Sequence, residues 1–356
     1  MQLKTPLAAV CLVLALTAGQ DARADGLIQL RNAYYKEQAT RVVQPMIDVQ
    51  AEASDRVDVN ANVLLDAITS ASEVAFNERR YEVGGGADVT LGNLRIGGFG
   101  RYSTEMDYRS LFAGVRMTAE LAKKNTTLGL VLGLSFDDVT NEGARGSIGF
   151  QERGDALDTR LVSASISQLV SPNALVGATY DLISMSGFME NPYRLVPVAG
   201  LANTFEEVPE TRLRHAMLVF GRYFLEATGS TFYGSYRLYT DNWEVTSHTP
   251  EFRIIQELVP DLDLHLRYQY HTQGEAYFFQ PTYDEPGTVL RTSDVKLSSF
   301  TSQVLGVKLD GALSVLGLSG RLGDIRLDVL LHYVMQRNRF GNAVVFQTGM
   351  SIPFGD

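Results

Sequence analysis

Apolar and polar residues alternate along much of the chain, most clearly in the segment from Asp261 to Phe279. One parity is apolar, with Leu262, Leu264, Leu266, Tyr268 and Tyr270, and the other is polar, with Asp263, His265, Arg267, Gln269 and His271. A period of two predicts a β-strand with one apolar and one polar face. Such a strand fits a soluble β-protein with its polar face in water, or a transmembrane barrel with its apolar face in lipid.

Repeated segments of this kind follow one another, separated by residues that are typical of turns. They lie near 27–38, 41–54, 56–68, 79–92, 94–106, 108–122, 126–138, 155–170, 174–188, 210–226, 230–246, 248–259, 262–278, 294–311, 322–336 and 342–354. We therefore expect an all-β fold, a transmembrane antiparallel up-and-down β-barrel of about sixteen strands. The first segment and residues 311–322 are the least regular, and fourteen strands is the alternative count.

The connectors between these segments alternate in length. The longer ones lie near 68–78, 139–155, 189–210 and 279–293, and strands that alternate in direction bring all four to one end of the barrel. Transmembrane barrels have short periplasmic turns and longer external loops, whereas a soluble sandwich places long loops at either end. The pattern therefore favours a membrane barrel in which the leucines and tyrosines of 261–279 face lipid. Tyr277, Phe278 and Phe279 suit an aromatic girdle at the membrane interface.

Both ends of the chain carry signals typical of export. Lys4, an apolar run over 6–18 and the small residues Ala22 and Ala24 predict a secretory signal peptide, residues 1–24, cleaved after Ala24. The barrel would then occupy 25–356, with localisation in the outer membrane of a Gram-negative bacterium. Near the other end, Gly349, Ile352 and Phe354 fit the spacing of the insertion signal that barrel-insertion machinery recognises, displaced by two residues from the C-terminus.

Composition excludes several kinds of site. Cys11 is the only cysteine, so the mature chain would contain no disulfide, thiolate metal site or cysteine nucleophile. The net charge of −10 and the absence of a basic stripe argue against nucleic acid as a partner. We expect no cofactor and no metal: His265 and His271 would lie about 20 Å apart along one strand. The acidic residues Asp137, Asp138 and Glu142 lack the spacing of a calcium loop.

The polar faces of neighbouring strands concentrate charge on one predicted wall of the lumen. Our candidates for setting selectivity are Arg222, Arg237, Asp241, Glu251, Arg253, His265, Arg267 and His271. The same residues could instead form ion pairs that brace the wall, and both roles can hold together. A shift of one residue in register would move any of them to the lipid face.

Several blocks of the sequence are similar to an uncharacterised bacterial outer-membrane β-barrel family, porin-like and catalogued as a domain of unknown function. These blocks are SGFMENPYR at 186–194, YRLYTDNWEVTSHTPEF at 236–252, RYQYHTQGEAYFF at 267–279 and KLSSFTSQVLGVKL at 296–309. They occur in order and extend over most of the mature chain. The resemblance implies a barrel fold and an outer-membrane location, but no activity and no catalytic residue.

The function that these observations predict is passive passage of small polar solutes or ions through a porin-like channel. The alternative is a structural barrel that anchors or sheathes a periplasmic or extracellular protein partner, in a secretion or electron-transfer assembly. A barrel hydrolase comes third: we expect no enzyme, because no nucleophile motif such as G-x-S-x-G occurs near His271 or His332. The loop from Met189 to Pro209 is the candidate plug of the lumen.

Overall fold

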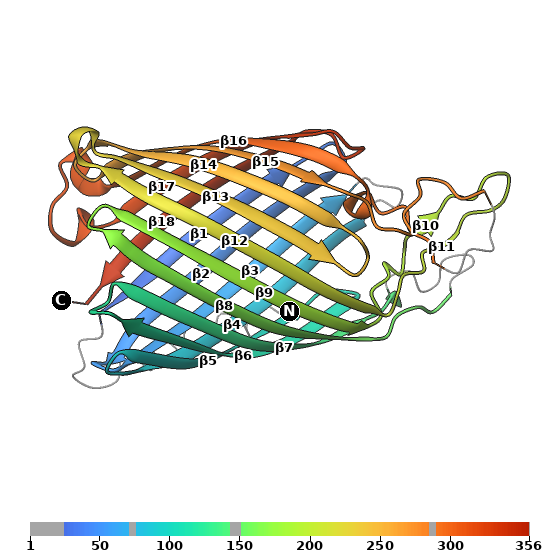
Figure 1. The fold of residues 1–356 in the computed structure, drawn as a ribbon, viewed down its shortest axis with the longest axis horizontal. Coiled ribbons are helices and arrows are strands. Elements are labelled where there is room, and N and C mark those ends of the chain that lie inside the picture. The colour runs from blue at the N-terminus through green and yellow to red at the C-terminus, as the bar shows by residue number, and fades with distance from the viewer. Residues whose placement is uncertain (1–24, 71–75, 143–150, 285–289, 356) are drawn as a thin grey trace.

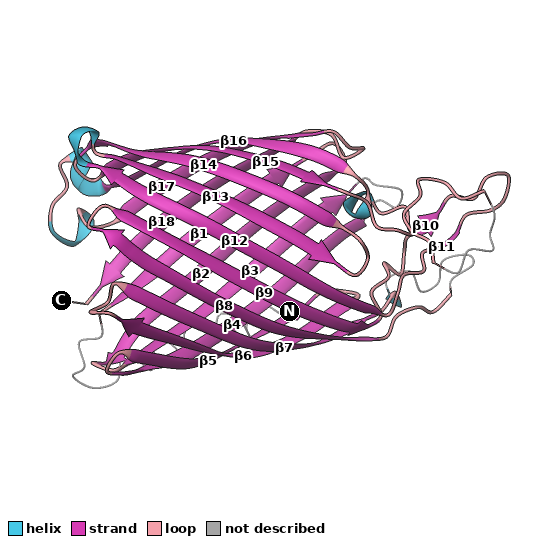
Figure 2. Cartoon of the chain, in the orientation of Figure 1, coloured by secondary structure: helices cyan, strands magenta, loops and turns pink. Residues whose placement is uncertain are grey.

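The computed structural model describes residues 25–70, 76–142, 151–284 and 290–355. The predicted signal peptide, residues 1–24, lies outside the described residues. The described chain forms one closed antiparallel barrel with a few short 3₁₀ helices at its ends (Figures 1 and 2). Within the described ranges, no helix is long and apolar enough to cross a membrane.

The barrel wall consists of sixteen strands, which confirms the predicted fold class and count. They are β1 (Gly26–Lys36), β2 (Thr40–Ser54), β3 (Val57–Ser70), β4 (Phe76–Leu91), β5 (Leu94–Thr104), β6 (Tyr108–Leu121), β7 (Thr126–Val139), β8 (Ala156–Ser171), β9 (Ala174–Gly187), β12 (Thr211–Leu225), β13 (Ser230–Asp241), β14 (Thr246–Val259), β15 (Leu262–Gln273), β16 (Phe300–Ala312), β17 (Arg326–Gln336) and β18 (Ala343–Phe354). Each strand pairs with its neighbour in sequence, and β1 pairs with β18 from Gly26↔Phe354 to Lys36↔Val344. This last pairing closes the wall.

The outer surface of the barrel is apolar. Cross-strand neighbours Leu266, Val307 and Leu331 form an exposed row over β15, β16 and β17. On the opposite parity, Lys308 forms ion pairs with Asp310 on its own strand at 3.1 Å and with Asp328 on β17 at 3.0 Å. Only a lipid environment favours an apolar exterior around a charged interior, so the outward parity of β15 faces lipid as predicted.

The two ends of the barrel differ. The end that carries Gly26 and Phe354, which we call the turn end, has mostly tight turns, whereas the four long connectors lie at the opposite end, which we call the loop end (Figure 1). The irregular segment around 311–322 is the one long connection at the turn end. It folds as two 3₁₀ helices, η4 (Leu313–Leu316) and η5 (Gly320–Leu322), and not as a strand.

The predicted strand ends are wrong around the longest connector. β15 ends at Gln273 and β16 begins at Phe300, so residues 274–284 and 290–299 lie outside the wall, at the loop end. Phe278 is buried there against Trp243, with ring centroids 5.2 Å apart, and is not part of a lipid-facing girdle. An aromatic cluster near a strand end predicts burial, but it does not distinguish a lipid interface from the core of a loop.

The parity of the wall predicts opposite effects of one substitution at adjacent positions. Leu331 faces outward near the middle of β17, and Leu330 lies on the inward parity beside Lys308. Leu331→Arg should lower the free energy of unfolding by about 2–4 kcal/mol, because a charge is placed in hydrocarbon. Leu330→Arg should change it by less than about 1 kcal/mol. Guanidinium unfolding in phospholipid vesicles measures both, and equal losses would contradict the assigned faces.

Candidate solute pathway in the barrel lumen

Glu251 is the centre of a charged cluster on the inner wall. Its carboxylate accepts hydrogen bonds from Arg267, at 3.0 Å from Nε and 2.6 Å from Nη2, and from Gln269 at 3.0 Å. It also forms an ion pair with Arg253 on its own strand. The structure therefore brings three of the predicted residues together on β14 and β15. Since the Glu251 side chain is only 6% exposed, it acts here mainly as a partner for the two arginines.

Asp241 is also on the inner wall, but its side chain is fully buried. Its carboxylate accepts from Arg212 at 2.5 Å, from the Tyr239 hydroxyl at 2.7 Å, and from the backbone N–H groups of Trp243 and Val245 at 3.0 Å each. With these partners the carboxylate organises the turn between β13 and β14, and the predicted role of Asp241 in selectivity stays a prediction. This turn also explains why β13 ends at Asp241, five residues before the predicted end at 246.

The remaining predicted residues occupy different heights of the lumen. Arg237 and His271 lie near the loop end, and Arg222 is exposed near the turn end of β12. His265 is the cross-strand neighbour of Lys308, beside the cluster of Asp310 and its partners. Together these residues extend the polar wall over most of the barrel length rather than forming one site.

The opposite wall carries a second charged cluster, whose pairing we did not predict. Arg116 donates to Asp88 at 2.6 and 2.5 Å and to Asn60 at 3.1 Å, and Arg95 bridges Asp88 and Asp58. Gly84 leaves room for the Asn62 side chain on this wall, because a Cβ on Gly84 would lie 2.4 Å from Asn62 Oδ1. The alternation of apolar and polar residues predicts that each of these charged side chains faces the lumen. Only the register of the strands determines which side chains of β3 to β6 meet.

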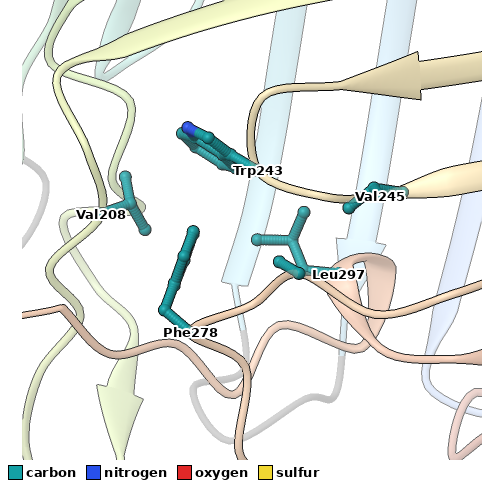
Figure 3. Packing of buried hydrophobic residues seen from close by; sticks show 6 residues of the cluster. Val208, Trp243, Val245, Phe278 and Leu297 are labelled. Carbon is teal, nitrogen blue, oxygen red and sulfur yellow. The ribbon is translucent and has the colours of Figure 1, made fainter.

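The loops at the loop end pack into a cap. Trp243, Val208, Phe278 and Leu297 face one another in its apolar core (Figure 3). Ion pairs tie the same loops: Arg194 contacts Glu206 at 3.1 Å and Asp294 at 2.8 Å. The predicted plug loop, which contains the short strands β10 (Leu195–Val196) and β11 (Thr204–Phe205), extends beyond the strand ends (Figure 1). It covers the mouth and does not enter the middle of the lumen.

A cavity of about 480 Å³ lies beneath this cap at the mouth of the lumen. Its wall side chains come from β8, β9 and β12–β15, and its roof from the loops. Residues that line it include Met185, Arg194, Arg212, Arg214, Arg237, Tyr239, Trp243, His271, Lys296 and Leu297. A volume of this size accommodates a small organic solute.

Neither of the histidines considered for a hydrolase, His271 and His332, forms a side-chain hydrogen bond with a serine among the described residues. His271 contacts the Thr249 hydroxyl through Nδ1 at 2.8 Å and the Gln273 amide oxygen through Nε2 at 3.3 Å. A neutral amide does not supply the negative charge with which a catalytic carboxylate stabilises an imidazolium. The contacts around His271 therefore do not form a Ser-His-Asp arrangement.

Gly349, Ile352 and Phe354 all lie on β18, next to β1. A Cβ on Gly349 would come within 2.2 Å of Asp328 Oδ2, so this glycine leaves room for a lumen carboxylate. A Cβ on Gly26 would meet the Phe354 ring at 2.2 Å, which shows that the ring packs over β1 at the closure. Their predicted role in recognition by the insertion machinery stays a prediction.

The sequence model of a protein family of unknown function, DUF3570, matches residues 74–342 of this chain. The chain belongs to this family. The search of curated proteins finds no significant match.

Among solved structures, the chain is similar to a bacterial polysaccharide outer membrane secretin, with a TM-score of 0.55 and 8% identity over 94% of this chain and 100% of that chain. It is also similar to OccK3 (OpdO) of Pseudomonas aeruginosa, with a TM-score of 0.49 and 10% identity over 93% and 95% of the two chains. For a BenF-like porin from Pseudomonas fluorescens Pf-5, the TM-score is 0.48 and the identity is 11%, over 94% of this chain and 99% of that chain. At these low sequence identities the similarity shows the barrel fold alone. The polysaccharide secretin, with a TM-score of 0.55, is the structure that supports it.

A half-buried carboxyl at the loop end predicts a pH dependence of stability. Burial raises the pKa of Glu105 to about 7, and the negative charge of Glu78 adds to this shift. The folded state therefore holds the proton more tightly than the unfolded chain, and stability falls as the pH rises from about 4.5 to about 7. Glu105→Gln should remove this fall and stabilise the protein by about 1–2 kcal/mol at pH 8, a value reduced from full linkage because the carboxyl is partly exposed.

Guanidinium unfolding of wild type and Glu105→Gln at pH 5 and pH 8 tests this linkage. Asp55→Asn, a change at an exposed tight turn, is the matched control and should leave the pH dependence as in wild type. An unchanged difference between the two pH values in Glu105→Gln would show that Glu105 is not its source.

Proposed function

We propose that the protein is a porin-like channel of the bacterial outer membrane that passes small polar solutes or ions. In this proposal, residues 1–24 are a signal peptide, residues 25–356 form the barrel after insertion by the barrel-insertion machinery, and the loop end faces the exterior. The observation that carries the proposal is the inner wall: charged clusters around Asp310, Glu251 and Asp88 line a closed barrel whose outside is apolar. Such a wall supports water and ions in the lumen.

Preference for anions is the second part of the proposal. On the side of the mouth formed by β12 and β13, the carboxylate of Asp241 is already paired with Arg212. Arg237 has no carboxylate within ion-pair distance among the described residues, and its guanidinium lies 5.6 Å from the centre of the Tyr239 ring. A cation without a partner at the entrance attracts anions and repels cations.

The alternative is a barrel that anchors or sheathes a protein partner on either side of the membrane. A sheath needs a partner that fills the lumen, whereas the described loops here fold onto one another through Arg194, Glu206 and Asp294. This packing favours the channel. An enzymatic role has no support from the contacts of His271, and the proposal includes none.

Conductance in a planar bilayer tests the proposal. The purified folded protein should give discrete current steps, and in a potassium chloride gradient its reversal potential should indicate preference for chloride. Arg237→Glu should shift that potential toward the value for potassium, because it reverses a charge at the mouth. Lys123→Glu, in a tight turn at the turn end, is the control with the same charge change and should shift it less. A folded protein without current steps would contradict a channel.

A further inference from the structure

The cavity beneath the cap has two chemically different regions. Trp243, Val208 and Leu297 belong to the apolar core of the cap and also line the cavity. Arg214 and Arg237 line it from the strands, three and four residues from the loop-end termini of β12 and β13. One region therefore suits an apolar group and the other a negative charge.

The charges that line this cavity are not balanced. Five basic side chains line it, and two acidic ones: Arg194, Arg212, Arg214, Arg237 and Lys296 against Glu206 and Asp294. Arg194 uses both of the acidic residues, and Arg212 uses Asp241, which lies beside the cavity. Arg214, Arg237 and the exposed Lys296 are left without a carboxylate partner among the described residues.

Arg214 is the clearer candidate to bind an anion. Its Nε is buried and has no hydrogen-bond partner within the described part of the chain. Arg212, its neighbour on the same face, is already held by Asp241 and lies 4.1 Å above the Trp243 ring. A buried guanidinium N–H without a partner is costly, and an anion in the cavity would remove that cost.

The apolar region is held in place before any ligand enters. The Trp243 indole N–H donates to the Thr211 carbonyl at 3.0 Å, and its backbone N–H donates to Asp241. Its ring packs at 77° against Phe278. A fixed indole beside arginines is a preorganised surface for a molecule with an apolar body and one charged end.

We propose that this cavity binds a small amphiphilic carboxylate, with its carboxylate on Arg214 and Arg237 and its apolar part against Trp243 and Leu297. The inference rests on the proposed channel function and specifies its solute class. Guanidinium groups bind carboxylates with charge-assisted hydrogen bonds. The acidic groups Glu206 and Asp294 near the roof disfavour a ligand with a second negative charge at its apolar end.

The chain provides its own probe, because Trp243 is the only tryptophan. We would titrate the full folded protein in detergent with sodium cyclohexanecarboxylate, which does not absorb where tryptophan is excited. Cyclohexylmethanol, which has the same ring without the charge, and sodium chloride at equal ionic strength are the ligand controls. The expected result is a saturable change in Trp243 emission with the carboxylate, and binding at least tenfold weaker for the alcohol.

Three variants locate the site. Arg214→Gln and Arg237→Gln should each raise the Kd for cyclohexanecarboxylate at least tenfold, since each removes a charge-assisted contact. Arg56→Gln, which makes the same change at an exposed arginine in a tight turn at the turn end, should leave the Kd unchanged. Two arginine variants are used so that a failure of one to fold, seen as loss of heat-dependent gel mobility, leaves the other to decide.

Equal binding of the alcohol and the carboxylate, or an equal loss of binding in Arg56→Gln, would overturn the proposed site. The outcome is distinguishable from that of the channel proposal. Current steps without saturable binding would leave the channel standing and reject the site. Saturable binding that depends on Arg214 and Arg237, in a protein that conducts no ions, would keep the site and reject the channel.

Discussion

Closure of the wall by β1 and β18 is the constraint on which the rest of the structure depends. In hydrocarbon a backbone N–H or C=O without a partner costs several kcal/mol, so a sheet in the membrane cannot keep an open edge. The pairing from Gly26↔Phe354 to Lys36↔Val344 removes both edges at once. With the edges gone, each strand can be apolar outside and charged inside, and the alternation of residues then determines which side chains meet lipid and which meet water.

The charged interior is mostly neutralised where carboxylates gather. Glu251, Asp88 and Asp310 each have two or more basic partners, which stiffen the wall and limit the free charge in the middle of the lumen. The mouth differs, because the carboxylate of Asp241 is used inside the protein to hold Arg212 and the turn that carries Trp243. That use leaves Arg214 and Arg237 as surplus positive charge below the cap. The proposed channel therefore assigns bracing and selectivity to different members of one row of charges.

Much of the wall could be predicted because its signal is local. The alternation around Leu266 and Arg267 assigns both faces of β15, and the inner-face position of Arg253 and Glu251 follows in the same way. Which partners meet depends on register, so the contact of Arg116 with Asp88, 28 residues away, was not predictable. Parity places Asp241 on the inner wall, but it does not reveal that the backbone N–H groups of a turn donate hydrogen bonds to its carboxylate. The cap was also not predictable, because its contacts join distant parts of the chain. Arg194 and Asp294 are 100 residues apart, and the apolar loop residues resemble the ends of strands.

The most direct test of the central claim asks whether current flows past the polar face of the wall. Thr179 lies on the inward parity of β9 and Ala178 on the outward parity, and their cross-strand partners are Leu218 and Val219. Each position would be changed to cysteine in a Cys11→Ala background, and a thiol reagent carrying a sulfonate would be added during a planar-bilayer recording. The account predicts that the current through Thr179→Cys falls irreversibly while that through Ala178→Cys is unchanged. An equal response of the two variants, or none in Thr179→Cys, would contradict a conducting lumen.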